Sequence, residues 1–510
     1  MNHHLITLMV LLPFLGAIVQ SFLPAHLPKR EGFNLSRWVT LGTSLASSLC
    51  GLLLVLGMQT QTSDLQAVET LPWIGSFAIS YDMGIDGLNV LLVLLIAIIF
   101  PLLISSEWNQ KSGSRGMHGL MLVLQSSLAG AVCSQDLFLM FFFWALSALP
   151  FYFLIGIWGG SGRETAAFRY IVSSAIGNAL FFTAMVLIYY SLDPHTFSLK
   201  ELAGGKLEKV VFHFLGADLS VSSVAFGLIG LGLALRAPIW PLHGWFTQVA
   251  QEAPPSVFVA LTSVTVPVAT YIFVRLGYSL FPETTSFSSQ GIVIVGVLNL
   301  IMGGLCAIAQ KGLRLLVAYI CLSEVGLILI GIGSLNSAGM VGAVYQELAL
   351  GLGMAGFGLF SGILVNRTGQ SQFLDESGAA KLGGIATQAP MTALVAGVVI
   401  ASLLGFPGLS GFVGHALLMI GSYSVHPAAV ILAGASLLFA TYYLFTMYRF
   451  VFLGKSSGFI QNFEDLSLWE RSYLLPLVGC ILLFGIYPKP LIELVRPTVL
   501  TLLSTLSGVK

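Results

Sequence analysis

The sequence predicts an all-α membrane protein with about fourteen transmembrane helices. Hydrophobic residues make up 56% of its 510 residues and charged residues only 9%, whereas a soluble domain carries about 25% charged residues. Apolar runs of about 20 residues, the length that crosses a hydrocarbon core of roughly 30 Å, recur along the chain. Two of these runs are interrupted by prolines. We therefore expect residues 1–510 to form a single polytopic membrane domain, because no loop is long enough to hold a soluble one.

Fourteen apolar runs approach this length. With that count, fourteen of the 22 basic residues fall on one side of the membrane, seven, including Arg275, on the other, and Arg236 within a span. This bias fits the positive-inside rule with both termini outside. The runs are Leu5–Leu23, Trp38–Met58, Leu88–Ile104, Met117–Cys133, Leu137–Trp158, Tyr170–Tyr190, Val221–Ala250, Val257–Leu276, Ile292–Ala309, Leu313–Ile332, Met340–Val365, Met391–Ser422, Ala428–Phe452 and Tyr473–Tyr487.

The seventh and twelfth runs are expected to break into half-helices. The seventh contains Pro238 and Pro241, and the twelfth contains the sequence from Gly405 to Gly408 around Pro407. Proline removes a backbone donor and clashes with the preceding turn. Broken helices at membrane depth occur only where protein or water meets the freed backbone groups, as in ion-translocating proteins. Their offset of five spans suggests an inverted repeat; the alternative is coincidence in a glycine- and proline-rich chain.

Composition and motifs exclude several other functions. The chain has equal numbers of acidic and basic residues, so nothing favours nucleic-acid binding. The five cysteines form no CxxC pair and are expected to be small buried residues. The sequence lacks the HExxH, P-loop and GxSxG motifs, so we predict no catalytic, cofactor-binding or metal-ligating residue in this chain.

The candidate functional residues are ionisable groups inside the spans. A charge at the bilayer centre costs a few kcal/mol, so such residues are functional hypotheses by default. They are Arg236 and His243 at the seventh span, Glu324 in the tenth, Glu347 in the eleventh and His415 in the twelfth. Each is expected either to lie on a proton path or to have a structural role. The structural alternatives are an ion pair of Arg236 with Glu324 or Glu347 and neutral, hydrogen-bonded imidazoles.

Several motifs resemble one family. They are FFFWALSALPFYFLIGIWGG (Phe141–Gly160), RAPIWPLHGWF (Arg236–Phe246), QEAPPS (Gln251–Ser256), AQKGLRLLVAYICLSEVGLILIGIG (Ala309–Gly333), DGLNVLLVLL (Asp86–Leu95) and GFPGLSGFVGHALLM (Gly405–Met419). They resemble the antiporter-like membrane subunits of complex I, and among those the M (chain 4) type most. The resemblance runs nearly end to end and implies two inverted five-helix repeats, residues 117–276 for helices 4–8 and residues 292–452 for helices 9–13.

The sequence departs from the family pattern at the usual proton-channel positions. Where the family has a glutamate in the fifth helix, this chain has Ala145, and where it has a lysine in the seventh, this chain has Arg236. His415 replaces a lysine or glutamate, and Glu324 a position often occupied by histidine. The family pattern also places a lysine or histidine near Pro267. Arginine cannot lose its proton near neutral pH, whereas histidine can exchange protons there. The first half of the path is therefore expected to be disabled in its usual form.

Three functions are compatible with these residues. The first is a membrane-arm subunit of a complex I-like redox-driven ion pump with an altered or partly disabled proton path. The second is a non-pumping structural or coupling subunit of such a complex. The third is a subunit of a cation/proton antiporter or an inorganic-carbon uptake assembly. The first two imply flavin, iron–sulfur and quinone in partner subunits and none in this chain, with other antiporter-like and small membrane subunits as partners. The expected location is a bacterial plasma membrane or an energy-transducing membrane such as the thylakoid.

Overall fold

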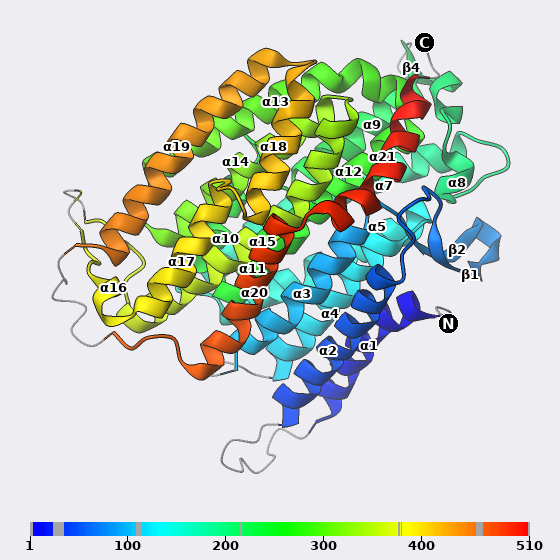
Figure 1. Cartoon of the computed structure of the whole chain (residues 1–510). Helices are drawn as coiled ribbons and strands as arrows, with labels where there is room; N and C mark the ends of the chain where they lie inside the picture. Colours follow the sequence, from blue (N-terminus) through cyan, green and yellow to red (C-terminus); the bar gives the residue numbers. More distant parts are fainter. Residues whose placement is uncertain are drawn as a thin grey trace. The chain divides into compact units, whose positions relative to one another are not determined.

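The computed structural model describes residues 4–23, 35–108, 115–214, 217–375, 378, 380–454 and 463–507. The described part is mainly helical and confirms the expected fold class (Figure 1). Eleven helical segments are long and apolar enough to cross a membrane, and three shorter apolar helices occupy the remaining predicted spans. The chain is thus a multi-pass membrane protein.

The chain divides into two compact units. Unit 1 comprises residues 1–237, 264–290 and 492–510, and unit 2 comprises residues 238–263 and 291–491. The predicted repeats, residues 117–276 and 292–452, are defined by symmetry and not by contacts, and they stay a prediction.

Unit 1 contains most of the N-terminal half of the chain. Helices α1, α2 and α4 lie side by side within it (Figure 1). Its helices are α1 (Leu5–Phe22), α2 (Leu35–Leu56), α3 (Val90–Ser106), α4 (Arg115–Cys133), α5 (Leu137–Leu146), α6 (Ala148–Trp158), α7 (Arg163–Tyr190), α8 (Leu199–Leu202), α9 (Val221–Ala234) and α12 (Val266–Leu280), with 3-10 turns at Gly75–Phe77 and Lys206–Lys209.

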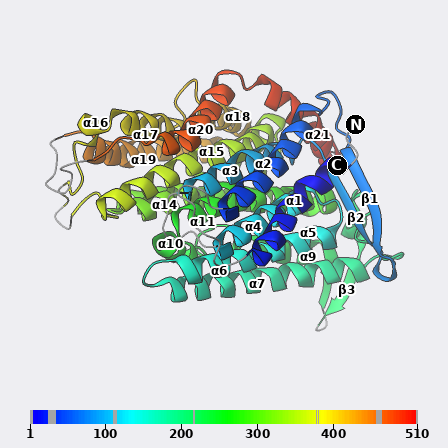
Figure 2. The same cartoon turned by 90° about the horizontal axis from the view of Figure 1, so that it is seen from below.

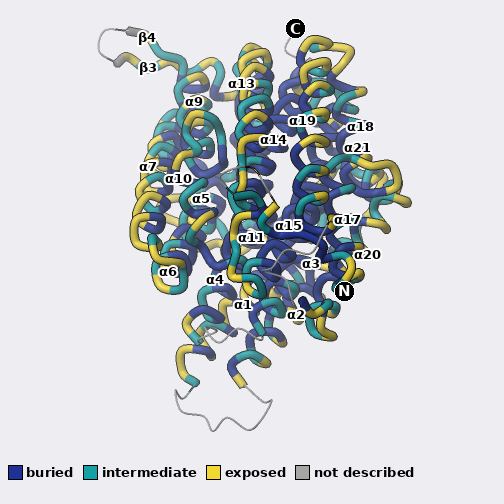
Figure 3. Tube along the Cα trace, turned by 90° about the vertical axis from the view of Figure 1, so that its left-hand side faces the viewer, coloured by how far each residue is buried: buried dark blue, intermediate teal, exposed yellow. Residues whose placement is uncertain are grey.

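Unit 2 is built around two well-buried helices, α14 and α15. In the most apolar stretches of these two helices, 89% and 94% of residues are buried, against 33% in α19 and 28% in α20. Figure 3 shows α15 as largely buried. The helices are α10 (Gly244–Glu252), α11 (Pro255–Ala260), α14 (Leu313–Gly333), α15 (Ser337–Thr368), α16 (Ile385–Gln388), α17 (Pro390–Leu403), α18 (Ser410–Tyr423), α19 (Pro427–Phe452) and α20 (Leu468–Ile486); α13 (Pro282–Ile308) begins in unit 1 and continues into unit 2.

Both predicted helix breaks are present. The seventh span ends as α9 and resumes as α10, and the twelfth ends as α17 and resumes as α18. Two further irregularities were not predicted. Ser147 separates α5 from α6, and a π-helical turn, Leu261–Thr265, joins α11 to α12. A π turn or an interrupted helix frees backbone groups that nearby side chains must satisfy.

Helix starts follow from local sequence. Asp136 accepts a hydrogen bond from the backbone N–H of Leu139 at the start of α5, and Asn336 accepts one from Ala338 at the start of α15. Ser467 and Glu470 form a reciprocal capping box on α20. Such caps satisfy N–H groups that have no partner within the helix.

The structure adds two hairpins and one helix to the prediction. β1 (Gln66–Ile74) pairs antiparallel with β2 (Ile79–Ile85), and β3 (Val211–Phe214) pairs antiparallel with β4 (Ala217–Ser220). The first hairpin lies beside the start of α1 (Figure 2), where Glu69 accepts hydrogen bonds from the N–H groups of Ile6 and Thr7. Helix α21 (Lys489–Ser507) was missed because it contains three charged residues and is therefore less apolar than the runs that we counted as membrane spans. Both hairpins are short and lie in polar loops, so the fold class stays all-α.

Candidate functional site

The five predicted intramembrane residues fall in different units. Arg236 belongs to unit 1, whereas His243, Glu324, Glu347 and His415 belong to unit 2. Within unit 2, the structure brings Glu324 and His415 into direct contact. Each unit therefore presents a separate buried ionisable site.

Glu324 and His415 form a buried acid–imidazole pair. Glu324 comes from the middle of α14 and His415 from α18, the second half of the broken twelfth span. The His415 Nε2 atom lies 3.0 Å from Glu324 Oε2, and the two side chains are only 5% and 10% exposed. At this distance a hydrogen bond joins the two groups, and its direction depends on the tautomer and charge of the imidazole. The two residues therefore form one buried, hydrogen-bonded acid–imidazole site.

Gln346 on α15 supplies a third member of the site. Its side-chain N–H donates to the same Glu324 oxygen at 2.8 Å. Gly414 packs against this amide, since a Cβ at Gly414 would lie 2.1 Å from Gln346 Oε1. The close packing holds Gln346 in place as a donor to this carboxyl group.

The helix break brings backbone directly against the imidazole. Gly405 has φ +69°, and a Cβ there would lie 2.6 Å from His415 Nδ1. Only glycine adopts this conformation readily and leaves the required room. The Nδ1 atom of His415 has no hydrogen-bond partner among the described residues. The second ring nitrogen thus faces the break while the first contacts Glu324.

His243 and Glu347 lie elsewhere in unit 2. His243 precedes α10 and is half-buried, with its ring 6.2 Å from that of Tyr319 on α14. None of the hydrogen bonds described for His243 or for the Glu324–His415 pair connects the two. Glu347 is buried on α15, next in sequence to Gln346. The roles predicted for His243 and Glu347 remain predictions.

Arg236 is held by uncharged groups in unit 1. Its Nη1 donates to the Trp144 carbonyl at 2.7 Å, and its Nη2 donates to Ser147 Oγ at 2.8 Å and to the Tyr170 hydroxyl at 3.5 Å. Its guanidinium carbon lies 3.8 Å from the centre of the Trp144 ring, and the residue is 1% exposed. A cation over an aromatic face gains about 2 kcal/mol when desolvated. The unpredicted break at Ser147 explains these contacts, because it leaves a hydroxyl and a carbonyl facing the guanidinium.

The expected partner of Arg236 was therefore wrong among the residues that the structure describes. We expected a carboxylate, Glu324 or Glu347, but the recorded hydrogen bonds of Arg236 all go to neutral oxygens. Glu324 is bonded instead to His415 and Gln346. Ala145, where the family resemblance implies a carboxylate, is half-buried beside Trp144. Dipoles and an aromatic ring stabilise this cation in place of a counter-ion.

Asn299 on α13 was missed by the sequence reasoning. Its Oδ1 accepts from the N–H of Trp240 at 2.7 Å, and its Nδ2 donates to the carbonyls of Pro238 and Leu322. The side chain is fully buried. Asn299 thus satisfies backbone groups released by the seventh-span break, as required at membrane depth. An isolated asparagine in an apolar run was the available signal.

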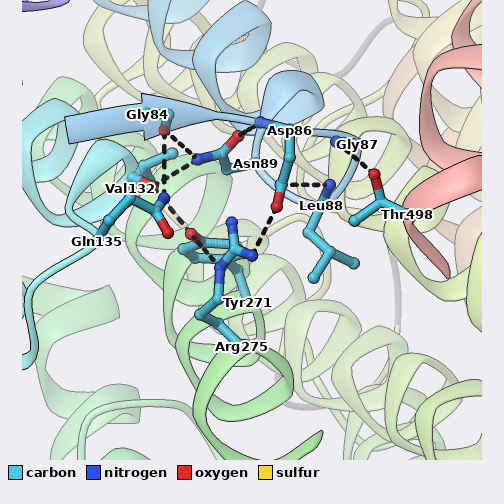
Figure 4. Close-up of polar contacts among 10 residues, drawn as sticks. All are labelled: Gly84, Asp86, Gly87, Leu88, Asn89, Val132, Gln135, Tyr271, Arg275 and Thr498. Atoms are coloured by element: carbon cyan, nitrogen blue, oxygen red, sulfur yellow. Dashed lines mark hydrogen bonds and ion pairs between the residues drawn. The ribbon is translucent and has the colours of Figure 1, made fainter. Parts of the chain in front are cut away.

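A second missed feature is a buried ion pair in unit 1 (Figure 4). Arg275 on α12 donates to Asp86 Oδ2 at 2.6 Å and to the Tyr271 hydroxyl at 3.1 Å. Tyr271 in turn donates to the carbonyl of Val132 at the end of α4. The Arg275 and Asp86 side chains are 9% and 4% exposed. Counting Arg275 as a loop charge was therefore wrong, because it lies within a helix and has a buried partner.

The same network fixes the turn that precedes α3. Asn89 accepts from the N–H of Asp86 and donates to the carbonyls of Gly84 and Val132. The N–H of Gly87 donates to Thr498 on α21 at 3.0 Å (Figure 4). The hairpin, α3, α4, α12 and α21 are thereby joined at one point of unit 1.

The fold and these sites define a class before any comparison. Broken membrane helices with buried ionisable groups beside the breaks are typical of polytopic proteins that move ions. No cluster of three or more His, Cys, Asp or Glu residues suited to a metal occurs within the described ranges.

Comparison with known proteins gives the family. Residues 134–441 match the family described as the transmembrane NADH:quinone oxidoreductase/Mrp antiporter family. The chain is 32% identical to NAD(P)H-quinone oxidoreductase chain 4 2 of Thermosynechococcus vestitus, over 95% of this chain and 89% of that protein. It is 28% identical to NADH-quinone oxidoreductase subunit M of Mycobacterium tuberculosis, over 97% of this chain and 93% of that protein. The chain therefore belongs to the NADH:quinone oxidoreductase/Mrp antiporter family.

Solved structures share the fold at lower identity. A chain of respiratory complex I from Thermus thermophilus matches with a TM-score of 0.85 and 24% identity, over 98% of this chain and 99% of that one. A chain of the Mrp complex from Dietzia sp. matches with a TM-score of 0.82 and 19% identity, over 98% of each chain. These likenesses establish the shared fold.

Proposed function

We propose that this chain is a membrane-arm subunit of a complex I-like, redox-driven ion pump and that protons pass through its Glu324–His415 site. The named relatives are subunits of NADH- or NAD(P)H-quinone oxidoreductases, which supports the assembly. The observation that carries the proton role is the buried contact between Glu324 and His415 beside a helix break. Flavin, iron–sulfur and quinone chemistry is assigned to partner subunits, alongside other antiporter-like and small membrane subunits.

The pair can pass a proton without a permanent change in charge. A proton taken up at His415 Nδ1 gives an imidazolium, whose Nε2 proton then transfers to Glu324 Oε2. This leaves a neutral imidazole and a neutral carboxylic acid. Release of the carboxyl proton restores the starting carboxylate, to which Gln346 donates. The imidazole, now protonated at Nδ1, returns to its starting Nε2–H form by rotation of the ring or by proton exchange at its two nitrogens before the next cycle. Histidine suits this exchange because its ordinary pKa lies near neutral pH.

The site in unit 1 supports no such exchange. Arginine stays protonated under all physiological conditions, and no carboxylate stands at position 145 to accept a proton. We assign Arg236 to a fixed charge that braces the break at Ser147. The second candidate function is a non-pumping structural or coupling subunit. The fixed charge of Arg236 is the feature that favours it.

Proton uptake by proteoliposomes that contain the purified native complex tests the proposal. Glu324→Gln should lower the number of protons moved per quinone reduced, while the complex still assembles. Glu283→Gln is the matched control, because Glu283 is an exposed carboxylate in unit 1. An unchanged stoichiometry in Glu324→Gln would reject the proton role and favour the structural function. Co-purification without flavin- and iron–sulfur-binding chains would reject the assembly.

A further inference from the structure

We propose that helices α1, α2 and α4 enclose a water-filled half-channel that opens at the His118 end of unit 1 and reaches the middle of the membrane. It lies apart from both helix breaks, and it requires only that the chain spans the membrane. Its walls are buried polar side chains, which a lipid-facing helix trio does not need for packing. The occupant we infer is a file of water molecules.

A column of polar side chains follows the buried face of α2. Ser36, Thr40, Ser44 and Ser48 are spaced by four residues, so they share one helix face, and Ser47 lies beside them. All five are less than 9% exposed. From Ser36 to Ser48 the column rises about 18 Å at 1.5 Å per residue. That is more than half of a hydrocarbon core of roughly 30 Å.

Facing residues of α1 and α4 continue the column. Gln20 of α1 donates to the Ser36 carbonyl at 2.6 Å and to Thr40 Oγ1 at 2.7 Å. Ser36 Oγ lies 3.2 Å from His118 Nδ1 of α4. Two turns further along α4, Gln125 Nε2 lies 3.4 Å from Ser47 Oγ. The hydrogen bonds therefore run from the helix ends to the centre of the trio.

Three buried polar atoms in the column have no protein partner. They are Ser44 Oγ, Ser48 Oγ and Gln125 Oε1. Ser44 and Gln125 are 0% exposed and Ser48 is 4% exposed. Leaving a buried polar group without a hydrogen bond costs about 1–3 kcal/mol. Buried water usually supplies the missing hydrogen bonds of such groups.

The column has a mouth at one end. A surface groove of about 350 Å³ is lined by Gln20, Ser21 and Arg115, together with Gly116 and Gly119. Gln20 is shared by the groove and the column, so water in the groove is one side chain away from Ser36 and Thr40. Gly116 and Gly119 have no side chains, so they leave room for the groove on this face of α4. Arg115 also places the mouth on the side of the membrane predicted to be rich in basic residues.

The other end of the column is closed. Ser47 and Ser126 donate to the carbonyls of Met9 and Val10 in α1. Beyond them lies an apolar layer, where Gly51 packs on the sulfur of Met9 and on the side chain of Ala97. Charged groups return only at Glu69, which bonds the start of α1. The water file therefore ends near Gln125, and we describe it as a half-channel.

Thiol accessibility in sealed native vesicles tests the half-channel. Ser44→Cys and Ser47→Cys are introduced after the five native cysteines are replaced by alanine. A charged, membrane-impermeant thiosulfonate reacts with hydrated thiolates. We expect labelling from the His118 side to be about tenfold faster than in Leu49→Cys, the lipid-facing control, because only a hydrated site ionises the thiol. Leu49 is 58% exposed on the outer face of α2. Equal rates at the three positions would overturn the proposal.

Radiolytic hydroxyl-radical footprinting gives a second test on the unaltered complex. Met9 and Met140 are both fully or nearly fully buried in unit 1, but only Met9 lies at the inner end of the column. We expect Met9 to be oxidised several-fold faster than Met140, since radicals form from the bound water. Gln125→Leu should abolish the difference. Equal oxidation of the two methionines in the unaltered chain would contradict a water file.

Discussion

The ionisable sites of the two units differ in what their charges can do. In unit 1, the Arg236 cation lies over Trp144 and donates only to neutral oxygens. In unit 2, one hydrogen bond joins Glu324 and His415, the pair through which we propose that protons pass. Both sites lie beside an interrupted helix, at Ser147 in one and at Gly405 in the other. An interrupted helix thus accompanies an arginine cation in one unit and a hydrogen-bonded acid–imidazole pair in the other.

Burial beside a helix break is therefore common to the arginine cation and to the pair that we propose as the proton site. Both sites are almost fully excluded from solvent. What separates them is the chemistry of the buried group, because arginine retains its proton and histidine does not. Each prediction below changes one side of this comparison or the scaffold that supports it.

The largest effect on stability is expected from the Asp86–Arg275 pair that supports unit 1. Arg275→Met or Asp86→Val alone should lower the free energy of unfolding by about 3–5 kcal/mol, since each leaves an unpaired buried charge. The double variant should recover much of this loss, because no charge then remains unpaired. Thermal unfolding of the purified complex measures the stability of the single and double variants. A double variant less stable than both single variants would contradict the account.

Arg236→Met should destabilise unit 1 by about 3 kcal/mol, from the lost contact with the Trp144 ring and the lost hydrogen bonds to the Trp144 carbonyl and Ser147. Proton translocation per turnover should nevertheless be unchanged in the complexes that assemble. Arg236→Lys should recover only part of the stability, because lysine lacks the planar fork of donors. A lower proton yield in Arg236→Met, at full quinone reductase activity, would remove the contrast between the units.

Gly405→Ala tests the break in unit 2. The left-handed φ costs a non-glycine residue about 1–2 kcal/mol, and the added Cβ would push against His415 Nδ1. We expect a modest loss of stability together with a clear loss of proton translocation. Gly408→Ala is the matched control, because its φ is also positive, at +87°, but a Cβ there meets no neighbouring atom. Equal proton translocation in the two variants would show that the position of His415 does not matter.

Asp465 gives the smallest effect and a pH dependence outside the membrane. Partial burial would raise the pKa of Asp465, but hydrogen bonds from Leu466, Met391 and Thr392 outweigh it and hold the pKa below its usual value. This carboxylate caps the start of α17, so Asp465→Asn should cost about 1 kcal/mol at neutral pH. A lowered folded pKa stabilises above the unfolded pKa of about 3.9, and the contribution is lost as the pH falls through the folded pKa. Unfolding at pH 7 and pH 3 should therefore differ less in the variant.

The sequence was sufficient for the spans and for both proline-dependent breaks. The length of an apolar run and the position of a proline are local features, so they can be recognised from the sequence alone. The interruption at Ser147 was missed although Pro150 follows it by three residues, because this proline was not considered as a break. The Asp86–Arg275 pair was missed because its members are 189 residues apart in sequence. A sequence supplies residue types at each position, but the partners of a buried charge depend on how distant helices pack.

The same reasoning explains the outcome for the candidate sites. Glu324 and His415 were recognisable as charges in apolar runs, but nothing in the sequence joined them. Arg236 was recognised too, and its expected carboxylate partner was wrong because the backbone and ring of Trp144 were not considered as ligands for a cation.

Proton translocation by the exchanged pair is the most direct test of the central claim. Glu324→His and His415→Glu, each alone, should lower the protons moved per quinone reduced, because each leaves two like groups in contact. The double variant Glu324→His/His415→Glu restores one acid and one imidazole at the same two positions, and it should regain much of the lost translocation. If the assembled double variant translocates no better than the single variants, or if the single variants are unaffected, the pair does not carry the proton.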